Sequence, residues 1–172
     1  MTATTNTTPT TESAKSTEGD SAPAFCPLPS GAVAVDPKYQ DERTIRDILR
    51  SARTVAVVGL SPSVLRPSNF VGYYLQRHGY RIVPVNPKEK EILGETSYPS
   101  LSAIPFPVDV VDVFRRSEFV PAIAEEAVQI GAKALWLQFD VISPAGEATA
   151  ERGGLRVVVD RCLKIEHAHY GR

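Results

Sequence analysis

The chain has 172 residues, of which 42% are hydrophobic and 23% charged, and its formal net charge is -1. Nineteen basic residues are balanced by twenty acidic ones, and no basic run stands out, so the charge pattern argues against a nucleic-acid partner. No stretch of about eighteen apolar residues exists, which argues against a membrane-spanning helix. A chain of this length suits one domain with a sizeable core.

The beginning of the sequence differs in composition from the rest. Residues 1–21 are almost all small or polar, so ordering them would cost about 1–2 kcal/mol per residue without apolar burial to offset it. We expect a disordered tail over residues 1–28 and one folded domain over residues 29–172. The tail resembles neither a secretory signal nor a transit peptide. Cys26 and Cys162 suggest no disulfide framework or metal site, so a reducing cytoplasm is the expected location.

Helical periodicity first appears at residues 41–52, where apolar side chains share one face and Asp41 occupies the expected N-cap position. Downstream, short continuous apolar runs predict five strands: Thr54–Gly59, Arg81–Val85, Val108–Phe114, Ala134–Gln138 and Leu155–Asp160. The segments between them have helical character: residues 68–79, 117–132 and 144–154, followed by a C-terminal helix after residue 160.

The helix over residues 117–132 has the clearest pattern. Ser117 is its expected N-cap, and Gly131 ends it. Its apolar positions gather on one face, which turns Glu125, Glu126 and Gln129 toward solvent.

Strands without polar alternation are typical of a parallel sheet that is covered on both faces. Strands that alternate with helices imply right-handed crossovers. The predicted fold is therefore α/β: a Rossmann-like, doubly wound, mostly parallel five-stranded sheet with helices on both faces. In such sheets, ligands bind beyond the carboxyl ends of the strands, beside the point where strand order reverses.

The loop after the first strand, residues 59–69, has features of an anion site. Gly59 allows close approach of a ligand, the following helix starts near Ser68, and Arg66 suits phosphate oxygens. The loop lacks two of the three glycines of a dinucleotide fingerprint and the Gly-Lys-Ser/Thr ending of a P-loop, so NAD, FAD and P-loop ATP binding are disfavoured. Alternatively, Gly59 only begins a turn and Arg66 is a solvated charge.

The loop after the second strand carries Asn86, Pro87 and Lys88, where an NAD enzyme usually has an acidic residue. A lysine suits a phosphorylated ribose, which both NADP and coenzyme A contain. The alternative is a polar turn, and for Lys90 we prefer that interpretation.

The remaining loops are less informative. Phe114 is expected either in the core or beside an adenine. For Arg115 and Arg116 the sequence leaves three possible contacts open: a phosphate, a carboxylate or only water. Gln138 follows the fourth strand, where an amide could contact a ligand, whereas Trp136 is expected in the core. Near the C-terminus we expect Cys162 to be a structural thiol and the nearby Arg161, Glu166 and His167 to form ion pairs. No catalytic residue is predicted.

Three blocks of the sequence together resemble the small stand-alone CoA-binding domain family: VAVVGLSPSVLRPSNFVGYYLQRHGYRIVPVNPKEKEILGETSYPSL, VDVVDVFRRSEFVPAIAEEAVQIGAKALWLQ and VVVDRCLKIEH. The resemblance covers about residues 54–167, in the family's order. That family is similar to the N-terminal domain of the succinyl-CoA synthetase alpha subunit and has a Rossmann-like fold.

The resemblance implies a residue set for each part of coenzyme A. Around the pyrophosphate it places Gly59, Ser61, Arg66, Pro67 and Ser68. Bordering the adenosine 3′-phosphate it places Val85, Asn86, Pro87 and Lys88. Along the adenine or ribose it places Val113, Phe114 and Arg115, and near the pantetheine Leu137 and Gln138. One departure affects the last set, because the family usually continues with Gly-Val after this glutamine, and this chain has Phe139, Asp140 and Val141.

The synthetase works through a second domain that carries a phosphorylated histidine. None of His78, His167 and His169 lies in a comparable glycine-rich loop. The leading hypothesis is a module without catalytic activity that binds coenzyme A or an acyl-CoA as its small-molecule ligand. An NADP-linked oxidoreductase-like protein and a structural or regulatory oligomer with a vestigial cleft are the alternatives. A homodimer is the default assembly, and the sequence identifies no protein partner.

Overall fold

The computed structural model describes residues 34–171. The predicted tail, residues 1–28, and the predicted start of the domain lie outside these residues. The strands are β1 (Thr54–Val58), β2 (Arg81–Val85), β3 (Glu91–Ile92), β4 (Glu95–Thr96), β5 (Val110–Val113), β6 (Ala134–Leu137) and β7 (Arg156–Val158). The α-helices are α1 (Glu42–Ser51), α2 (Pro67–Arg77), α3 (Val120–Gln129), α4 (Pro144–Arg152) and α5 (Leu163–Tyr170), and short 3-10 turns cover Pro37–Gln40, Leu101–Ala103 and Ser117–Phe119.

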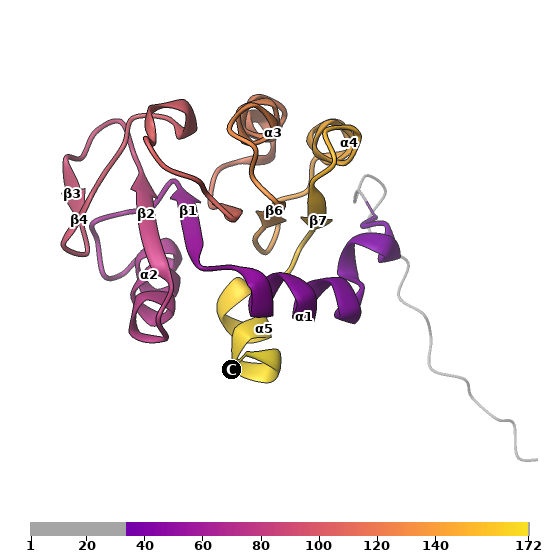
Figure 1. Cartoon of the computed structure of the whole chain (residues 1–172), viewed down its shortest axis with the longest axis horizontal. Helices are drawn as coiled ribbons and strands as arrows, with labels where there is room; N and C mark the ends of the chain where they lie inside the picture. Colours follow the sequence, from indigo (N-terminus) through magenta and orange to yellow (C-terminus); the bar gives the residue numbers. More distant parts are fainter. Residues whose placement is uncertain (1–33, 172) are drawn as a thin grey trace, which may run out of the picture. The chain divides into compact units, whose positions relative to one another are not determined.

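Five strands form one sheet in the order β2-β1-β5-β6-β7, and every pairing within it is parallel. Helices α3 and α4 cover one face, and α1, α2 and α5 cover the other (Figure 1). The predicted α/β fold with helices on both faces is confirmed. Strand order reverses at β1, because the chain leaves β1 for β2 on one side and returns to β5 on the other. The carboxyl ends of β1 and β5 therefore flank the switch point.

The core consists of two apolar layers, one on each face of the sheet. Val111, Leu135 and Val157 point toward α3 and α4. Trp136 belongs to the opposite layer, where it is fully buried and its indole N–H donates to the Arg161 carbonyl at 2.7 Å. Its predicted place in the core is confirmed, and the hydrogen bond satisfies the one polar atom that burial removes from water.

Two of the predicted helix ends are confirmed by the structure, and a third is not. Asp41 caps α1, because its carboxylate accepts the Thr44 N–H at 2.8 Å, and Gly131 ends α3 with φ 69°. The predicted N-cap at Ser117 is wrong. Its hydroxyl instead accepts the Ile142 N–H at 3.1 Å, and the segment enters α3 through a 3-10 turn. A contact 25 residues away has thus replaced the local cap.

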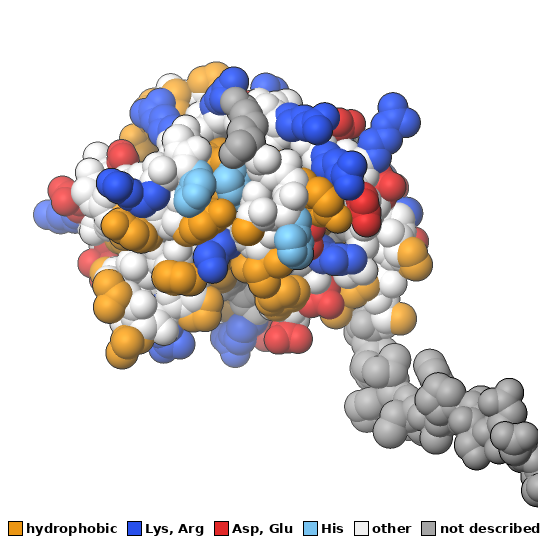
Figure 2. All heavy atoms as spheres, turned by 90° about the horizontal axis from the view of Figure 1, so that it is seen from below, with side chains coloured by type: hydrophobic (Ala, Val, Ile, Leu, Met, Phe, Trp, Pro, Cys, Tyr) orange, Lys and Arg blue, Asp and Glu red, His pale blue; other side chains and the backbone are white. Residues whose placement is uncertain are grey.

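The face formed by α1, α2 and α5 carries exposed apolar side chains among basic ones (Figure 2). They include Phe70 and Tyr73 on α2 and Ile165 on α5. Arg161 and Glu166 form the expected ion pair at 3.4 Å, and Cys162 is buried, as predicted for a structural thiol. Within residues 34–171, no helix combines the length and apolar character that crossing a membrane requires.

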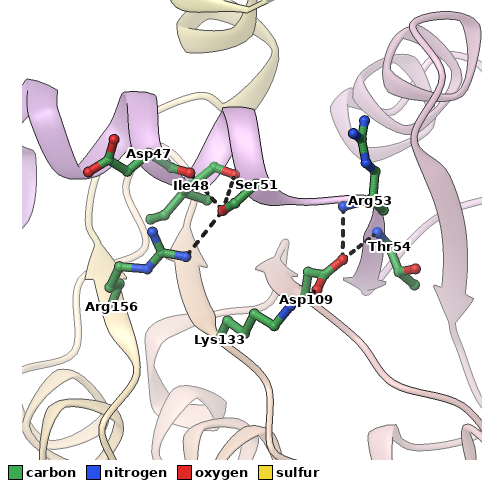
Figure 3. A network of polar contacts seen from close by, with 8 residues as sticks. All are labelled: Asp47, Ile48, Ser51, Arg53, Thr54, Asp109, Lys133 and Arg156. Atoms are coloured by element: carbon green, nitrogen blue, oxygen red, sulfur yellow. Dashed lines mark hydrogen bonds and ion pairs between the residues drawn. The ribbon is translucent and has the colours of Figure 1, made fainter.

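The amino ends of the strands are joined by a polar network (Figure 3). The Asp109 carboxylate accepts the Arg53 and Thr54 N–H groups at 2.8 and 3.0 Å and lies 2.7 Å from the Lys133 ammonium. Nearby, the Ser51 hydroxyl donates to the Asp47 carbonyl at 2.7 Å. This edge ties the start of β1 to the segments before β5 and β6.

Candidate functional site at the carboxyl edge of the sheet

A cleft of about 240 Å³ opens where β1, β2 and β5 end. It is lined by Gly59, Val85, Asn86, Pro87, Lys88, Phe114 and Arg115. All of these are predicted site residues, and they come from three segments far apart in the sequence. The structure therefore brings together the parts that were predicted to border the 3′-phosphate and the adenosine.

Gly59 holds the floor of this cleft together. Its φ is 88°, and a Cβ there would lie 3.0 Å from the Phe114 carbonyl oxygen and 3.1 Å from Cδ of Arg115. The Gly59 N–H donates to the Val85 carbonyl at 3.0 Å, and the Phe114 N–H donates to the Val58 carbonyl at 2.9 Å. Both the backbone angle and the close approach require glycine, because any side chain would push the strand ends apart.

The loop between β1 and α2 is shaped by buried side chains. Ser68 accepts the Ser61 N–H at 3.1 Å, and the Asn69 amide donates to the Ser61 carbonyl at 2.8 Å. Just after β2, the amide of the half-buried Asn86 donates to the Leu60 carbonyl at 2.9 Å. Ser61, Ser68 and Asn86, which were predicted near the ligand, therefore have a clear structural role. Whether they also touch a ligand stays a prediction.

Helix α2 starts beside this loop without a side-chain cap. Arg66 is its N-cap residue and makes no capping bond, and Pro67 follows at the first helical position. A helix start leaves backbone N–H groups and a partial positive charge, which favour an anion. The geometry is compatible with the predicted pyrophosphate contacts of Arg66 and Pro67, although neither residue lines the cleft itself.

Three cations around this edge have no acidic partner. Arg66, Lys88 and Arg115 are exposed and form no ion pair with any residue from 34 to 171. The Arg115 guanidinium instead lies over the Phe119 ring, 4.5 Å from its centroid. Arg116, by contrast, forms an ion pair with Glu118 at 2.9 Å. No carboxylate of the described residues thus lies within ion-pair distance of Arg66, Lys88 or Arg115.

The predicted residues at the ends of β5 and β6 are buried. Val113 and Leu137 have no exposed surface, and their carbonyls accept the Gln138 and Arg161 N–H groups, so their predicted ligand contacts stay predictions. The Gln138 side chain is 4% exposed, and its amide donates to the Asp112 carboxylate at 2.8 Å. The proposed ligand contacts of Gln138 stay a prediction, but the structure gives this amide a protein partner.

Asp112 is a buried acid that the sequence reasoning missed. It lies in the middle of β5 with no exposed surface, and one carboxylate oxygen has no hydrogen-bond partner in the described part of the chain. Burial raises the pKa of Asp112 to about 7, and the hydrogen bond from Gln138 only partly opposes that rise. The sequence did contain a sign of this residue, because an aspartate interrupts the apolar run of β5. A carboxyl group buried in this way needs a hydrogen-bond or charge partner, or it must be in its neutral form.

The position after Gln138, where the family usually has glycine, is Phe139 in this chain, and Phe139 does not adopt a positive φ. The left-handed backbone comes one residue later. Asp140 has φ 62°, and its N–H donates to the Asp160 carboxylate at 2.9 Å; Asp160 itself has φ 55°. Aspartate tolerates the left-handed region better than most residues because of its short polar side chain. The turn beside β6 is therefore formed by Asp140 and held by Asp160, one residue after the position of the family's glycine.

A second cavity, of about 250 Å³, adjoins the cleft on the α3 side of the sheet. The two share Val85, Pro87 and Arg115. Glu126 lines this cavity, and its carboxylate accepts the Leu101 N–H at 3.0 Å. The expectation that Glu126 faces solvent is wrong, because the segment around Leu101 packs against this side of α3, whereas Glu125 and Gln129 are exposed.

In the portion of the chain that the structure describes, no three His, Cys, Asp or Glu side chains converge to hold a metal ion.

The sequence model of one family, described as CoA binding domain, matches residues 53–168. The chain belongs to this CoA binding domain family. The match begins just before β1 and ends within α5, so it covers the whole sheet.

Two curated relatives differ in length. An uncharacterized protein of Bacillus subtilis, YneT, is 40% identical over 124 residues, which cover 72% of this chain and 92% of the relative. The ADP-forming acetate–CoA ligase II of Archaeoglobus fulgidus is 32% identical over 123 residues, 69% of this chain but 18% of the ligase. Similar sequences thus occur as nearly a whole chain in one relative and as a small part of the other.

Solved structures agree with the fold. A hypothetical protein from Pyrococcus horikoshii is 38% identical and superposes with a TM-score of 0.74, covering 76% of this chain and 92% of that one. A protein from Thermus thermophilus is 35% identical, with a TM-score of 0.72 and coverage of 76% and 98%. The Rossmann-like architecture is therefore shared by chains of similar size.

Proposed function

We propose that this chain binds coenzyme A or an acyl-CoA at the carboxyl edge of its sheet and has no catalytic activity of its own. The observation that carries the proposal is the group of three cations without acidic partners, Arg66, Lys88 and Arg115, around a cleft at the switch point. Coenzyme A has two phosphate-bearing parts, its pyrophosphate and its ribose 3′-phosphate. Arg66 and the start of α2 suit the first, and Lys88 suits the second.

The relatives support the same ligand. The segment of the acetate–CoA ligase that is similar to this chain is 18% of that enzyme, and this chain itself matches the CoA binding domain family. We infer that the shared segment handles coenzyme A and that ligation needs the remainder of the ligase. Neither the family nor these relatives favour the NADP-linked or the vestigial-cleft alternative.

The cleft itself supports binding without catalysis. Its lining includes no histidine, cysteine or carboxylate that would serve as nucleophile or general base. Asp112 is fully buried, so a ligand in the cleft does not reach it. The role assigned to the chain is to hold the nucleotide, for storage, sensing or presentation to a partner.

The test compares two arginines of the same helix. Arg66 is the N-cap of α2, and Arg77 is its last residue, about 16 Å away along the axis. Isothermal titration with coenzyme A should give saturable binding, weakened about tenfold or more by Arg66→Ala and unchanged by the control Arg77→Ala. Equal losses in both variants, or no loss in either, would contradict the placement of the pyrophosphate.

A further inference from the structure

Exposed apolar side chains are concentrated over two neighbouring helices. Within residues 34–171, the exposed large apolar side chains are Val64, Leu65, Phe70, Tyr73, Phe119, Phe139 and Ile165. Phe70 and Tyr73 belong to α2 and Ile165 to α5, and Val64 and Leu65 lie in the loop that leads into α2. None of these side chains belongs to α1, α3 or α4. The surface over α2 and α5 therefore holds most of the exposed apolar area (Figure 2).

The two helices form one continuous surface. Phe70 and Tyr73 lie three residues apart, so they share the outward side of α2. From α5, the Lys164 ammonium lies over the Phe70 ring, 4.5 Å from its centroid, and the next residue, Ile165, is exposed. Because this contact joins the two helices, we call Phe70, Tyr73, Lys164 and Ile165 the α2–α5 patch.

The exposed area is large enough for an interface. Phe70 and Tyr73 are 55% and 50% exposed, and an aromatic side chain has roughly 150–250 Å² to bury, so each leaves about 100 Å² in water. With Ile165 and the adjacent Val64 and Leu65, the apolar surface is on the order of 500 Å². Each partner in a standard interface buries about 800 Å², of which somewhat more than half is apolar. The surface therefore supplies the apolar part of one side of such an interface.

The chemistry of the patch is self-complementary. Glu166, the only acid in α2 and α5, is buried and paired with Arg161, so a second copy offers no carboxylate to Lys164. It does offer the Tyr73 ring, which makes no ring or cation contact with another described residue. An ammonium is attracted to the face of a tyrosine ring. In a two-fold contact, Lys164 of each copy therefore finds a ring on the other.

We infer that the α2–α5 patch is the interface of a symmetric homodimer, in which Lys164 of each copy lies over the partner's Tyr73. An anionic partner would find a single cation in the patch, and that ammonium already lies over the Phe70 ring. A second copy matches both the apolar area and the ring–cation pair, so it is the better occupant. None of the four side chains lines the cleft at the carboxyl edge, so the dimer needs no bound ligand and stands apart from the proposed function.

The experiment is analytical ultracentrifugation of the full chain, without ligand, over a range of concentrations. The wild type should show a reversible equilibrium between monomer and dimer. Tyr73→Arg places a cation opposite the partner's Lys164, so it should raise the dissociation constant of the dimer at least about a hundredfold. The matched control is Phe139→Arg, because Phe139 is as exposed as Tyr73 but lies in the loop after β6, and it should leave the dissociation constant unchanged.

Two further variants test the arrangement inside the interface. Tyr73→Phe keeps the face of the ring and should keep the dimer, whereas Lys164→Ala removes two ring–cation contacts and should weaken it about tenfold or more. Because these side chains are exposed or partly exposed, the variants should unfold at the temperature of the wild-type monomer.

Three results would overturn the inference. The first is a wild type that sediments as a monomer at every concentration; if that monomer also sediments with phosphatidylglycerol vesicles, the patch belongs to a membrane surface instead. The second is a dimer that Tyr73→Arg leaves intact, and the third is a dimer that Phe139→Arg weakens to the same extent. None of these results alters the expected binding of coenzyme A, which is measured separately by titration.

Discussion

The two edges of the sheet differ in how their charges are arranged. At the amino edge, the Asp109 carboxylate meets the Lys133 ammonium and two backbone N–H groups, so donors and acceptors are paired (Figure 3). At the carboxyl edge, Arg66, Lys88 and Arg115 have no acidic partners in the described chain. Arg53, Arg81 and Arg156 at the amino edge also form no ion pair with the described residues. The difference is therefore the network around Asp109, which joins the strand starts, whereas Lys88 and Arg115 at the carboxyl edge line a cleft.

Backbone geometry shows the same contrast. The turns that lead from helices into strands use Gly79, Gly131 and Gly154, each with positive φ and open space around the missing Cβ. At the carboxyl edge, Asp140 and Asp160 adopt positive φ, and Gly59 is closely surrounded. Unusual backbone at strand ends is common where ligands bind. The comparison predicts that changes at the carboxyl edge affect binding, whereas changes at the amino edge affect stability alone.

The largest effect is expected from alanine at Gly59. The substitution combines an unfavourable φ with a Cβ 3.0 Å from a carbonyl oxygen, so it should lower the free energy of unfolding by about 2–4 kcal/mol and abolish coenzyme A binding. Gly131→Ala, with no atom near its Cβ, should cost only about 1–2 kcal/mol and leave binding intact. Urea denaturation measures the free energy of unfolding, and isothermal titration measures coenzyme A binding. Equal losses of stability in the two variants would contradict the close packing around Gly59.

Asp109→Ala should lower the free energy of unfolding by about 2–3 kcal/mol at pH 7 without changing ligand affinity. The substitution removes a charged acceptor that serves two backbone N–H groups and the Lys133 ammonium. Burial tends to raise the pKa of Asp109, but bonds from Lys133 and the two N–H groups bring it below its ordinary value. The folded state therefore favours the carboxylate. Its contribution is present above the unfolded-state pKa and is lost as pH falls through the folded-state pKa, so the two proteins should converge in acid.

Asp112→Asn should raise the free energy of unfolding at pH 8 by about 1–3 kcal/mol, since asparagine removes a buried charge. The folded-state pKa of about 7 lies above the ordinary 3.8, so the neutral acid is favoured. The stabilising contribution of Asp112 is fully present below about pH 4 and is lost as pH rises from about 4 to 7, so the variant should gain stability relative to the wild type across this interval. A difference in the free energy of unfolding between the two proteins that stays constant across this interval would contradict a neutral Asp112.

Asp140→Gly should have the smallest effect, a rise in the free energy of unfolding of at most about 1 kcal/mol. Glycine adopts φ 62° without strain, but it also loses more conformational freedom on folding, so the two effects partly cancel. Thermal unfolding measures the shift. A clear loss of stability would instead mean that the Asp140 side chain stabilises the turn beside β6.

The sequence predicted the strands because each is a continuous apolar run, and it predicted the lining of the cleft because parallel strands end at one edge. Glu126 was misassigned because helical periodicity does not show that the segment around Leu101, 25 residues earlier, packs against it. Asp112 was overlooked inside an apolar run, and the short hairpin of β3 and β4 is too brief to give a periodic signal. Of these three, only the error at Glu126 comes from a contact between segments distant in sequence.

The most direct test of the central claim is a titration of the wild-type chain and Lys88→Ala with coenzyme A and with dephospho-coenzyme A, which lacks the 3′-phosphate. The wild type should prefer coenzyme A, and Lys88→Ala should lose that preference without weakening the dephospho form; Lys90→Ala, a nearby exposed lysine, should behave as the wild type. A wild-type chain that gives no binding heat and no thermal shift at millimolar coenzyme A would contradict the account.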